Sequence, residues 1–215
     1  MSESAVFVVG AFQENCYLLH DAEAGTAVFV DPGDDPVRLC AELERRAARL
    51  TAIWLTHAHL DHIGAIEGVR RAWPGVPVHL HPADTEVYEN AWRAAAMYNL
   101  PFEQPAPADR AFAEGETLTF AGESFTVWHL PGHSPGHVAL IGERRMFGGD
   151  LLFQGSVGRT DLPRSEPATM ARSLERLLTL PDPLIVLPGH GPATTIGAER
   201  ASNPFLTGAA RIPRS

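Results

Sequence analysis

The chain contains 215 residues, 45% of them hydrophobic and 20% charged, and carries a formal net charge of -9. This composition fits one large globular domain, and we expect a single domain over residues 1–215. The negative charge disfavours nucleic acid and anionic membrane as partners, because both attract basic surfaces. No apolar run approaches the roughly 18 residues that span a bilayer, and the first residues lack the basic region of a signal peptide. A cytoplasmic location is therefore expected.

The first half of the chain predicts short strands followed by an alternation of helices and strands. Turn residues at Gly10 and in the DAEAG segment separate three β-type runs, and the segment DPGDDP ends them. Apolar residues then recur at helical spacing, and Pro82 marks a further helix start. The predicted elements are strands at 6–9, 16–19, 26–30, 52–55 and 76–80, and helices from about 35 to 48, from 62 to 72 and from 82 to about 98.

The second half repeats this plan after a proline-rich loop that ends near Phe112. The predicted elements are strands at 116–120, 124–130, 137–141, 144–147 and 184–186, and helices at 167–180 and from 195. Two mixed β-sheets facing each other, with flanking helices outside, accommodate this order. The expected fold is therefore of the α/β class, a four-layer αβ/βα sandwich.

The segment THAHLDHIGA, residues 56–65, places three histidines and an aspartate directly behind an apolar strand. Burying such groups without a shared partner costs on the order of 1–3 kcal/mol each, so a metal ion is the expected partner. His57 and His59 point the same way from an extended segment, whereas Asp61 and His62 fall on the turn into a helix. Imidazole and carboxylate donors without thiolate suit zinc, iron or manganese.

Three later loops add ligand candidates, each after an apolar run and each beside a glycine. They are His133 in HLPGHSPGH, Asp150 in MFGGDLLF and His190 in IVLPGHGP. Glycine permits tight turns and close backbone approach, and functional sites are commonly built on loops at strand ends. A single histidine of this kind is more often structural, but the repeated pattern favours metal ligands.

These motifs, preceded by Asp31, resemble in their order those of the metallo-β-lactamase superfamily, and the resemblance covers essentially the whole chain. It implies two divalent metal ions, zinc being the first candidate and iron or manganese the alternatives. The implied ligands form two groups joined by a bridging aspartate: His57, His59 and His133 for one ion, Asp61, His62 and His190 for the other, and Asp150 between them.

A dinuclear site of this kind would hydrolyse a carbonyl compound. Two divalent ions roughly 3.5–4 Å apart lower the pKa of a shared water toward about 7 and generate a bridging hydroxide. One ion also polarises the carbonyl and stabilises the oxyanion. Asp61 and Asp150 are expected to act in catalysis by orienting the hydroxide. Asp31 is expected to accept hydrogen bonds from the ligand loop rather than to bind metal.

The segment FQGSVGRTDLPR, residues 153–164, indicates a substrate. It resembles the loop of type II glyoxalases, the hydroxyacylglutathione hydrolases, in which a basic residue nine positions after the bridging aspartate binds the carboxylate end of the thiol. Here that substrate-binding residue is Arg159, whose guanidinium suits bidentate carboxylate binding. The alternative is that Arg159 pairs with Asp161 or a loop carbonyl. The segment FQENCYLL and the C-terminal PGHGPATTIGAERASNPFL resemble the short form of these enzymes, so the expected reaction is hydrolysis of an S-2-hydroxyacyl thioester, such as S-lactoylglutathione, to a 2-hydroxy acid and a free thiol.

Other branches of the superfamily match the residues less well. Ala58 stands where flavodiiron oxidoreductases have glutamate, and Asp150 stands where the main class of zinc β-lactamases has cysteine. A persulfide dioxygenase with one iron, bound by His57, His133 and Asp150, is an alternative because that branch also carries GRTD. Its last ligand motif usually has alanine-His-Asp, whereas this chain has PGHGP. A hydrolase of another thiol ester or of a lactone is the other alternative.

Further expectations concern the substrate pocket and partners. Tyr88, Trp92 and Met97 share a predicted helical face, for which core packing is predicted and a wall of the acyl pocket is the alternative. The resemblance to related enzymes implies that the loop from Tyr98 to Phe112 lies where it could close over the substrate, and whether it does so is left open. We expect a small-molecule thioester as the partner, with no nucleic acid and no membrane, and a monomer or a homodimer.

Overall fold

Two six-stranded sheets form the middle of the molecule in a computed structural model that describes residues 3–211. The first has the order β1-β2-β3-β4-β5-β6 and the second β14-β13-β10-β9-β8-β7, so each half of the chain supplies one sheet. The strands of the first sheet are β1 Glu3–Val9, β2 Glu14–Asp21, β3 Thr26–Val30, β4 Arg49–Trp54, β5 Val78–Leu80 and β6 Arg110–Ala111. Those of the second are β7 Thr117–Phe120, β8 Glu123–His129, β9 Val138–Ile141, β10 Arg145–Gly149, β13 Ile185–Pro188 and β14 Thr194–Thr195.

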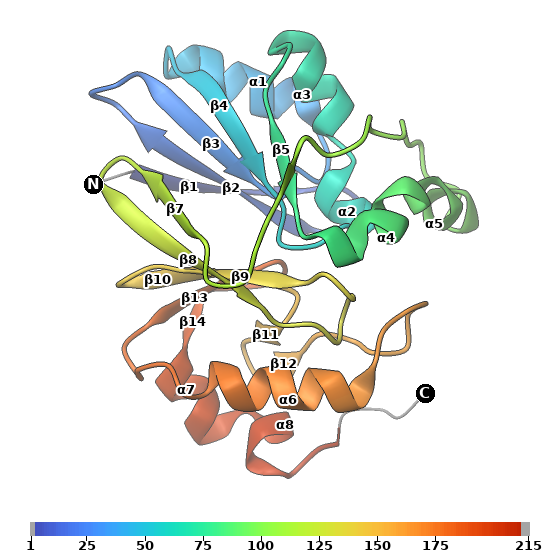
Figure 1. Ribbon diagram of the computed structural model, residues 1–215, viewed down its shortest axis with the longest axis vertical. Helices are drawn as coiled ribbons and strands as arrows, with labels where there is room; N and C mark the ends of the chain where they lie inside the picture. The colour runs from blue at the N-terminus through green and yellow to red at the C-terminus, as the bar shows by residue number, and fades with distance from the viewer. Residues whose placement is uncertain (1–2, 212–215) are drawn as a thin grey trace.

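Helices on the outer side of each sheet complete four layers (Figure 1). The helices are α1 Pro36–Arg45, α2 Leu60–Ile63, α3 Ile66–Ala72, α4 Thr85–Glu89, α5 Ala91–Met97, α6 Pro167–Leu177, α7 Ile196–Ser202 and α8 Pro204–Thr207, with a 3-10 turn η1 at Pro82–Asp84. α1 and α3 lie outside the first sheet, α6, α7 and α8 outside the second, and α2, α4 and α5 at one end (Figure 1). Within residues 3–211 no helix is long and apolar enough to cross a membrane. The predicted four-layer αβ/βα sandwich is confirmed.

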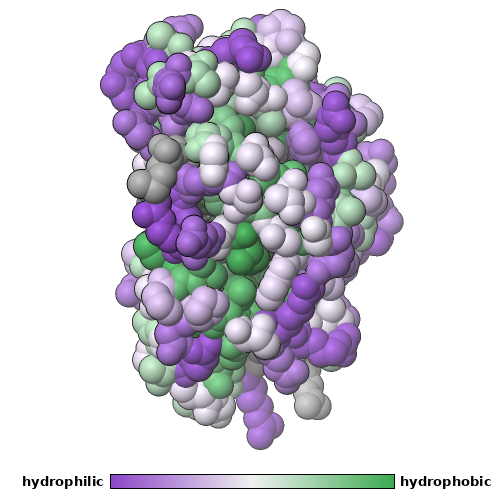
Figure 2. Space-filling model, turned by 60° about the vertical axis from the view of Figure 1, so that its left-hand side comes forward, coloured by the Kyte–Doolittle hydropathy of each residue, from purple (hydrophilic) through white to green (hydrophobic). Residues whose placement is uncertain are grey.

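Apolar side chains that point alternately to the two faces of a strand explain why both faces of a sheet are buried. In β3, Ala27 and Phe29 belong to the cluster beneath α1 and α3, whereas Val28 and Val30 belong to the cluster between the sheets. This is the two-residue period of a strand. A third cluster fills the space between the second sheet and α6. On the face shown in Figure 2, hydrophobic side chains gather near the middle, with more hydrophilic ones around them.

Parallel pairing brings the candidate ligand loops to one end of the sandwich. β3 pairs parallel to β4, and β10 pairs parallel to β13, so the loops after these strands leave each sheet on one side. Two backbone hydrogen bonds join the halves there: Asn15 N–H donates to the Gly189 carbonyl (2.7 Å) and Val138 N–H to the Thr56 carbonyl (2.8 Å). Loops from the two sheets therefore meet.

The predicted helix after the histidine cluster is divided into α2 and α3. The Ala65 N–H donates to the Pro32 carbonyl (3.0 Å), which draws the chain toward the loop after β3. Gly64 lies so close to this loop that a Cβ there would be 2.4 Å from the Gly33 carbonyl oxygen. The contact with the first sheet thus replaces a continuous helix.

The predicted helix from Pro82 to about residue 98 is also wrong as one element, because it is divided into η1, α4 and α5. Gln104, in the loop after α5, contacts the junction of α4 and α5. Its side-chain oxygen accepts from the Trp92 N–H (3.2 Å), and its side-chain nitrogen donates to the Tyr88 carbonyl (2.8 Å). Four short strands lie where no strand is predicted. These are β6, in the proline-rich loop, β11 Leu152–Phe153 and β12 Ser156–Val157, which form a hairpin, and β14.

Candidate metal centre

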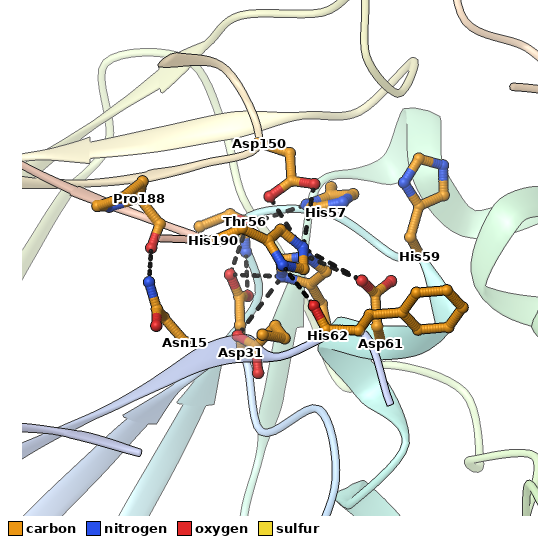
Figure 3. A network of polar contacts seen from close by, with 12 residues as sticks. Asn15, Asp31, Thr56, His57, His59, Asp61, His62, Asp150, Pro188 and His190 are labelled. Atoms are coloured by element: carbon orange, nitrogen blue, oxygen red, sulfur yellow. Dashed lines mark hydrogen bonds and ion pairs between the residues drawn. The ribbon is translucent and has the colours of Figure 1, made fainter. Parts of the chain in front are cut away.

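The predicted ligands come together where the loops of the two sheets meet (Figure 3). The donor atoms of one group lie within 4.8 Å of one another, and so do those of a second group. The first group is His57, His59 and His133, and the second is Asp61, His62 and His190. These are the two groups predicted from the sequence, and each combines residues of both halves of the chain.

The segment after β4 places its ligands by a change of backbone conformation. His59 is extended (φ -67°, ψ 152°), and Asp61 and His62 lie in the short helix α2 that follows. Gly149, at the end of β10, has φ 49°, and a Cβ there would lie 2.4 Å from Thr56 Oγ1. Only glycine therefore lets the loop that bears Asp150 approach the histidine segment closely.

Asp150 lies between the two groups. Its Oδ1 is 3.5 Å from His62 Nε2, and its Oδ2 is 3.4 Å from His133 Nε2 and 3.5 Å from His190 Nε2. One carboxylate oxygen thus faces a member of each group. The position suits the bridging role that the sequence predicts.

Four of the candidate ligand histidines have an oxygen partner at Nδ1, which leaves their Nε2 directed into the centre. The partners are Thr56 Oγ1 for His57 (3.1 Å), Asp31 Oδ2 for His62 (3.1 Å), the Arg159 carbonyl for His133 (2.8 Å) and the Phe12 carbonyl for His190 (3.1 Å). A carbonyl, carboxylate or hydroxyl oxygen accepts the Nδ1–H, so the Nε2 lone pair stays free. Metal-binding histidines commonly have such partners.

The unpartnered atoms of the centre fit metal ions. His57 Nε2, His62 Nε2 and Asp150 Oδ1 are buried and have no hydrogen-bond partner within residues 3–211. His59 Nδ1 lies 2.9 Å from His133 Nε2, so two imidazole nitrogens of the first group face each other. Buried acceptors without donors are costly unless a cation satisfies them. The histidine and aspartate groups are therefore suited to a dinuclear metal site.

Burial and mutual contacts shift the pKa values of the candidate ligands, down for His57, His59 and Asp150 and up for His62. Burial, together with the neighbouring histidines, lowers the pKa of His57 well below its usual value and that of His59 to about 3, so both imidazoles are neutral. Burial alone would raise the pKa of Asp150, but the nearby histidines, chiefly His62, lower it. Burial likewise opposes the charged form of His62, yet Asp150 and Asp61 raise its pKa.

Asp31 supports the ligand segment, as predicted. It follows β3 with φ 51°, an unusual conformation for a residue with a side chain. Its Oδ1 accepts from the Thr56 N–H (2.7 Å), and its Oδ2 accepts from the Thr56 hydroxyl (2.6 Å) and faces His62 Nδ1. One carboxylate thus fixes the residue before His57 and the imidazole of His62.

Asp84 is a supporting residue that the sequence reasoning missed. It is fully buried in η1, and it accepts from the Ala58 N–H (2.9 Å), the Gly136 N–H (2.5 Å) and the Ser134 hydroxyl. It therefore ties the loop of His57 and His59 to the loop of His133. The only signal was an aspartate in HPAD directly after a strand, where ligand-supporting groups are often found.

A cavity of about 700 Å³ adjoins the metal centre. Met97 and Tyr98 of the α5 end and Phe153 of the β11–β12 hairpin line it, together with Asp150. The predicted core packing holds for Tyr88, which is 1% exposed, but is wrong for Met97, which is 78% exposed and lines the cavity, and for Trp92, which is 50% exposed. The alternative of a pocket wall applies to Met97.

Arg159 also lines the cavity, but its guanidinium has a partner. Its Nε and Nη2 donate to the two carboxylate oxygens of Asp161 (2.7 and 2.8 Å). The alternative pairing considered for Arg159 is the one observed. Its contact with a substrate stays a prediction.

The layers, the ligand order and the two donor groups define the class of protein. The family model described as the metallo-beta-lactamase superfamily matches residues 9–190, and the chain belongs to this superfamily. Among curated relatives, hydroxyacylglutathione hydrolase GloC of Haemophilus influenzae is 41% identical over 94% of this chain and 96% of its own, and the probable metallo-hydrolase YqgX of Bacillus subtilis is 37% identical over 93% and 95%.

Two solved structures are similar over the same extent. One is described as TTHA1623 in a di-iron-bound form, with 46% identity and a TM-score of 0.86 over 94% of this chain and 100% of that chain. The other is described as the BLEG-1 B3 metallo-beta-lactamase, with 39% identity and a TM-score of 0.88 over 95% and 100%. The chain is therefore a metallo-hydrolase of this superfamily.

Proposed function

We propose that the protein hydrolyses S-2-hydroxyacyl thioesters, such as S-lactoylglutathione, to a 2-hydroxy acid and a free thiol. The observation that carries the proposal is that two ligand groups meet at Asp150 and open into one cavity of about 700 Å³, which accommodates an acyl group and a small thiol. The similarity to a relative named hydroxyacylglutathione hydrolase GloC supports this substrate class.

The histidines and aspartates of the centre would hold the metal ions, and two of the carboxylates would accept a hydrogen bond from the attacking water. Bound divalent ions would supply an activated water and polarise the substrate carbonyl. The oxygen partners at Nδ1 keep four imidazoles turned with Nε2 into the centre, where these nitrogens would hold the ions. Asp61 and Asp150 have lowered pKa values, so their carboxylates stay ionised and accept a hydrogen bond from the water. The cavity walls place the thioester beside them.

We propose zinc as the metal of both groups, since imidazole and carboxylate donors suit it. Iron is the alternative, because a similar structure is described as di-iron-bound. Elemental analysis of protein purified without added metal tests this proposal. Two zinc ions per chain are expected, and one ion per chain would contradict the dinuclear arrangement.

Hydrolysis of a β-lactam is the second candidate, favoured by the structure described as a B3 metallo-beta-lactamase. It requires the same attack on a carbonyl carbon. Oxidation of a persulfide at a single iron is less consistent with the site, because the group of Asp61, His62 and His190 is complete and would have no ion to bind. Hydrolysis of a β-lactam differs from the proposal in substrate alone, whereas oxidation of a persulfide differs in substrate and in consuming oxygen.

The test compares S-lactoyl and S-acetoacetyl thioesters of two thiols with a penicillin, a lactone and, in an oxygen electrode, glutathione persulfide. We expect the S-lactoyl esters to be hydrolysed fastest and no oxygen to be consumed. Asp61→Asn should lose one metal ion and lower the rate at least about 100-fold. The control is Asp182→Asn, because Asp182 is exposed and pairs with Arg200 away from the centre. This variant should keep both metal ions and the wild-type rate. Faster cleavage of the penicillin, or oxygen uptake without thioesterase activity, would overturn the proposal.

A further inference from the structure

The charges of the cavity wall are few, and their partners decide where an anionic substrate binds. Besides the candidate metal ligands, the charged residues that line the cavity are Glu86, Arg93, Arg159 and Arg164, and most of the other lining residues are apolar. A carboxylate binds most strongly to a guanidinium whose N–H groups are not already engaged. The state of the three arginines therefore matters.

Two of these arginines already have a carboxylate. Asp161 occupies Arg159 through both of its oxygens, and Glu86 forms an ion pair with Arg164. Asp161 is only two residues from Arg159, and a tethered partner competes at an effective concentration in roughly the mM range. A substrate carboxylate would have to displace it, so Arg159 is a poor anchor.

Arg93 differs from both. It lies on α5, on the face that includes Ala94 and Met97 and lines the cavity. Within residues 3–211 no carboxylate pairs with its guanidinium, whose ring contact is with Trp92, 5.3 Å from Cζ to the ring centroid. A guanidinium stacked on an aromatic ring keeps its N–H groups available at the edge. A carboxylate in the cavity would displace only water from Arg93.

We propose that Arg93 binds the carboxylate of the thiol portion of the substrate, and that the preferred thiol carries one carboxylate on an otherwise apolar body. This inference rests on the proposed thioester hydrolysis. Among the described residues that line the cavity, Arg93 alone has a guanidinium without a carboxylate partner, and this one cation matches one carboxylate. Val87, Met97 and Phe153, in the remaining wall, favour an uncharged remainder because they gain from excluding water.

Paired substrates test the proposal. S-lactoyl-N-acetylcysteine and its methyl ester differ only in the carboxylate, and so do the thioethers S-butyl-N-acetylcysteine and its methyl ester, which cannot be hydrolysed. Arg93→Gln should raise KM for the acid about 10- to 30-fold, leave KM for the methyl ester within about twofold, and change kcat little. Arg93→Lys should recover most of the loss. In calorimetry the wild type should bind the thioether acid more tightly than its ester, and Arg93→Gln should abolish the difference.

Two arginine variants serve as controls. Arg159→Gln should change the acid and the ester alike, and Arg172→Gln, an exposed residue of α6 outside the cavity, should change neither. A rise in KM for the acid in Arg159→Gln but not in Arg93→Gln would overturn the proposal and restore Arg159 as the anchor. If the wild type cleaves no thioester while the thioether preference still depends on Arg93, the proposed function fails and the anion site stands.

Discussion

Replacing Asp84 by asparagine tests whether one buried carboxylate sets the geometry of both histidine loops. The two side chains have nearly the same shape, so the change makes no cavity and removes only the charge and one acceptor. If the amide oxygen keeps the Ser134 hydroxyl and the Gly136 N–H, the amide NH2 faces the Ala58 N–H, and two donors oppose each other.

The lost charge-assisted hydrogen bond and the unpaired buried donor each cost about 1–3 kcal/mol. The free energy of unfolding of metal-free protein should therefore fall by about 2–6 kcal/mol. Since Ala58 lies between His57 and His59, the change should also weaken zinc binding about 10- to 100-fold.

Urea unfolding of the metal-free protein measures the first effect, and zinc titration against a chromophoric chelator measures the second. Asp21→Asn is the matched control, because Asp21 also accepts two backbone N–H groups, from Glu23 and Ala24, but at an exposed turn. It should change the free energy of unfolding by about 1 kcal/mol or less. A wild-type midpoint and a wild-type zinc affinity in Asp84→Asn would refute the reasoning.

Other substitutions and conditions probe the rest of the centre. Asp150→Asn removes the charge between the two groups, so elemental analysis should find less metal and kinetics a kcat at least about 100-fold lower; full metal content would contradict the bridging position. Asp31→Asn should weaken zinc binding about 10-fold in the same chelator assay, because a ligand imidazole loses its acceptor. The metal-free protein should lose stability as the pH falls below about 6.5 toward 3: folded His59 has a pKa of about 3, whereas the unfolded chain takes up the proton near 6.5 and so binds more protons in that window. Urea midpoints at pH 7 and 5 measure this dependence, which His59→Gln should reduce. Asn203→Ala removes hydrogen bonds to carbonyls of the β11–β12 hairpin and should raise KM more than it lowers kcat, because the hairpin lines the cavity.

The layers and the ligand groups could be predicted from the sequence because their signals are local. Apolar alternation marks strands such as β3, and the spacing of His57, His59, Asp61 and His62 states which residues leave an extended segment and which enter a helix. The resemblance to a known family then supplied the pairing of these residues with later loops. The fold and the two donor groups were therefore predictable before any coordinates.

The parts that could not be predicted depend on contacts between residues far apart in the chain. Asp84 acts through Ala58, 26 residues away, and Gly136, 52 residues away, and no periodic pattern connects them. The same reason explains the error in the predicted helical face. Gln104 interrupts the helix between Tyr88 and Trp92, so the two residues no longer share one face.

The metal centre and the wall of the adjoining cavity differ in how tightly the fold constrains their residues. Buried loops with carboxylate and carbonyl partners hold the candidate ligands, and a change there disturbs the fold and metal binding together. The cavity wall at the end of α5 is exposed at Met97 and Tyr98, so its residues can change with little cost to stability. Similar proteins with names as different as hydroxyacylglutathione hydrolase and B3 metallo-beta-lactamase are what such a division predicts. Under the proposed function, the metal centre would set the attack on a carbonyl, and the exposed wall, with Arg93 in it, would select which carbonyl compound is attacked.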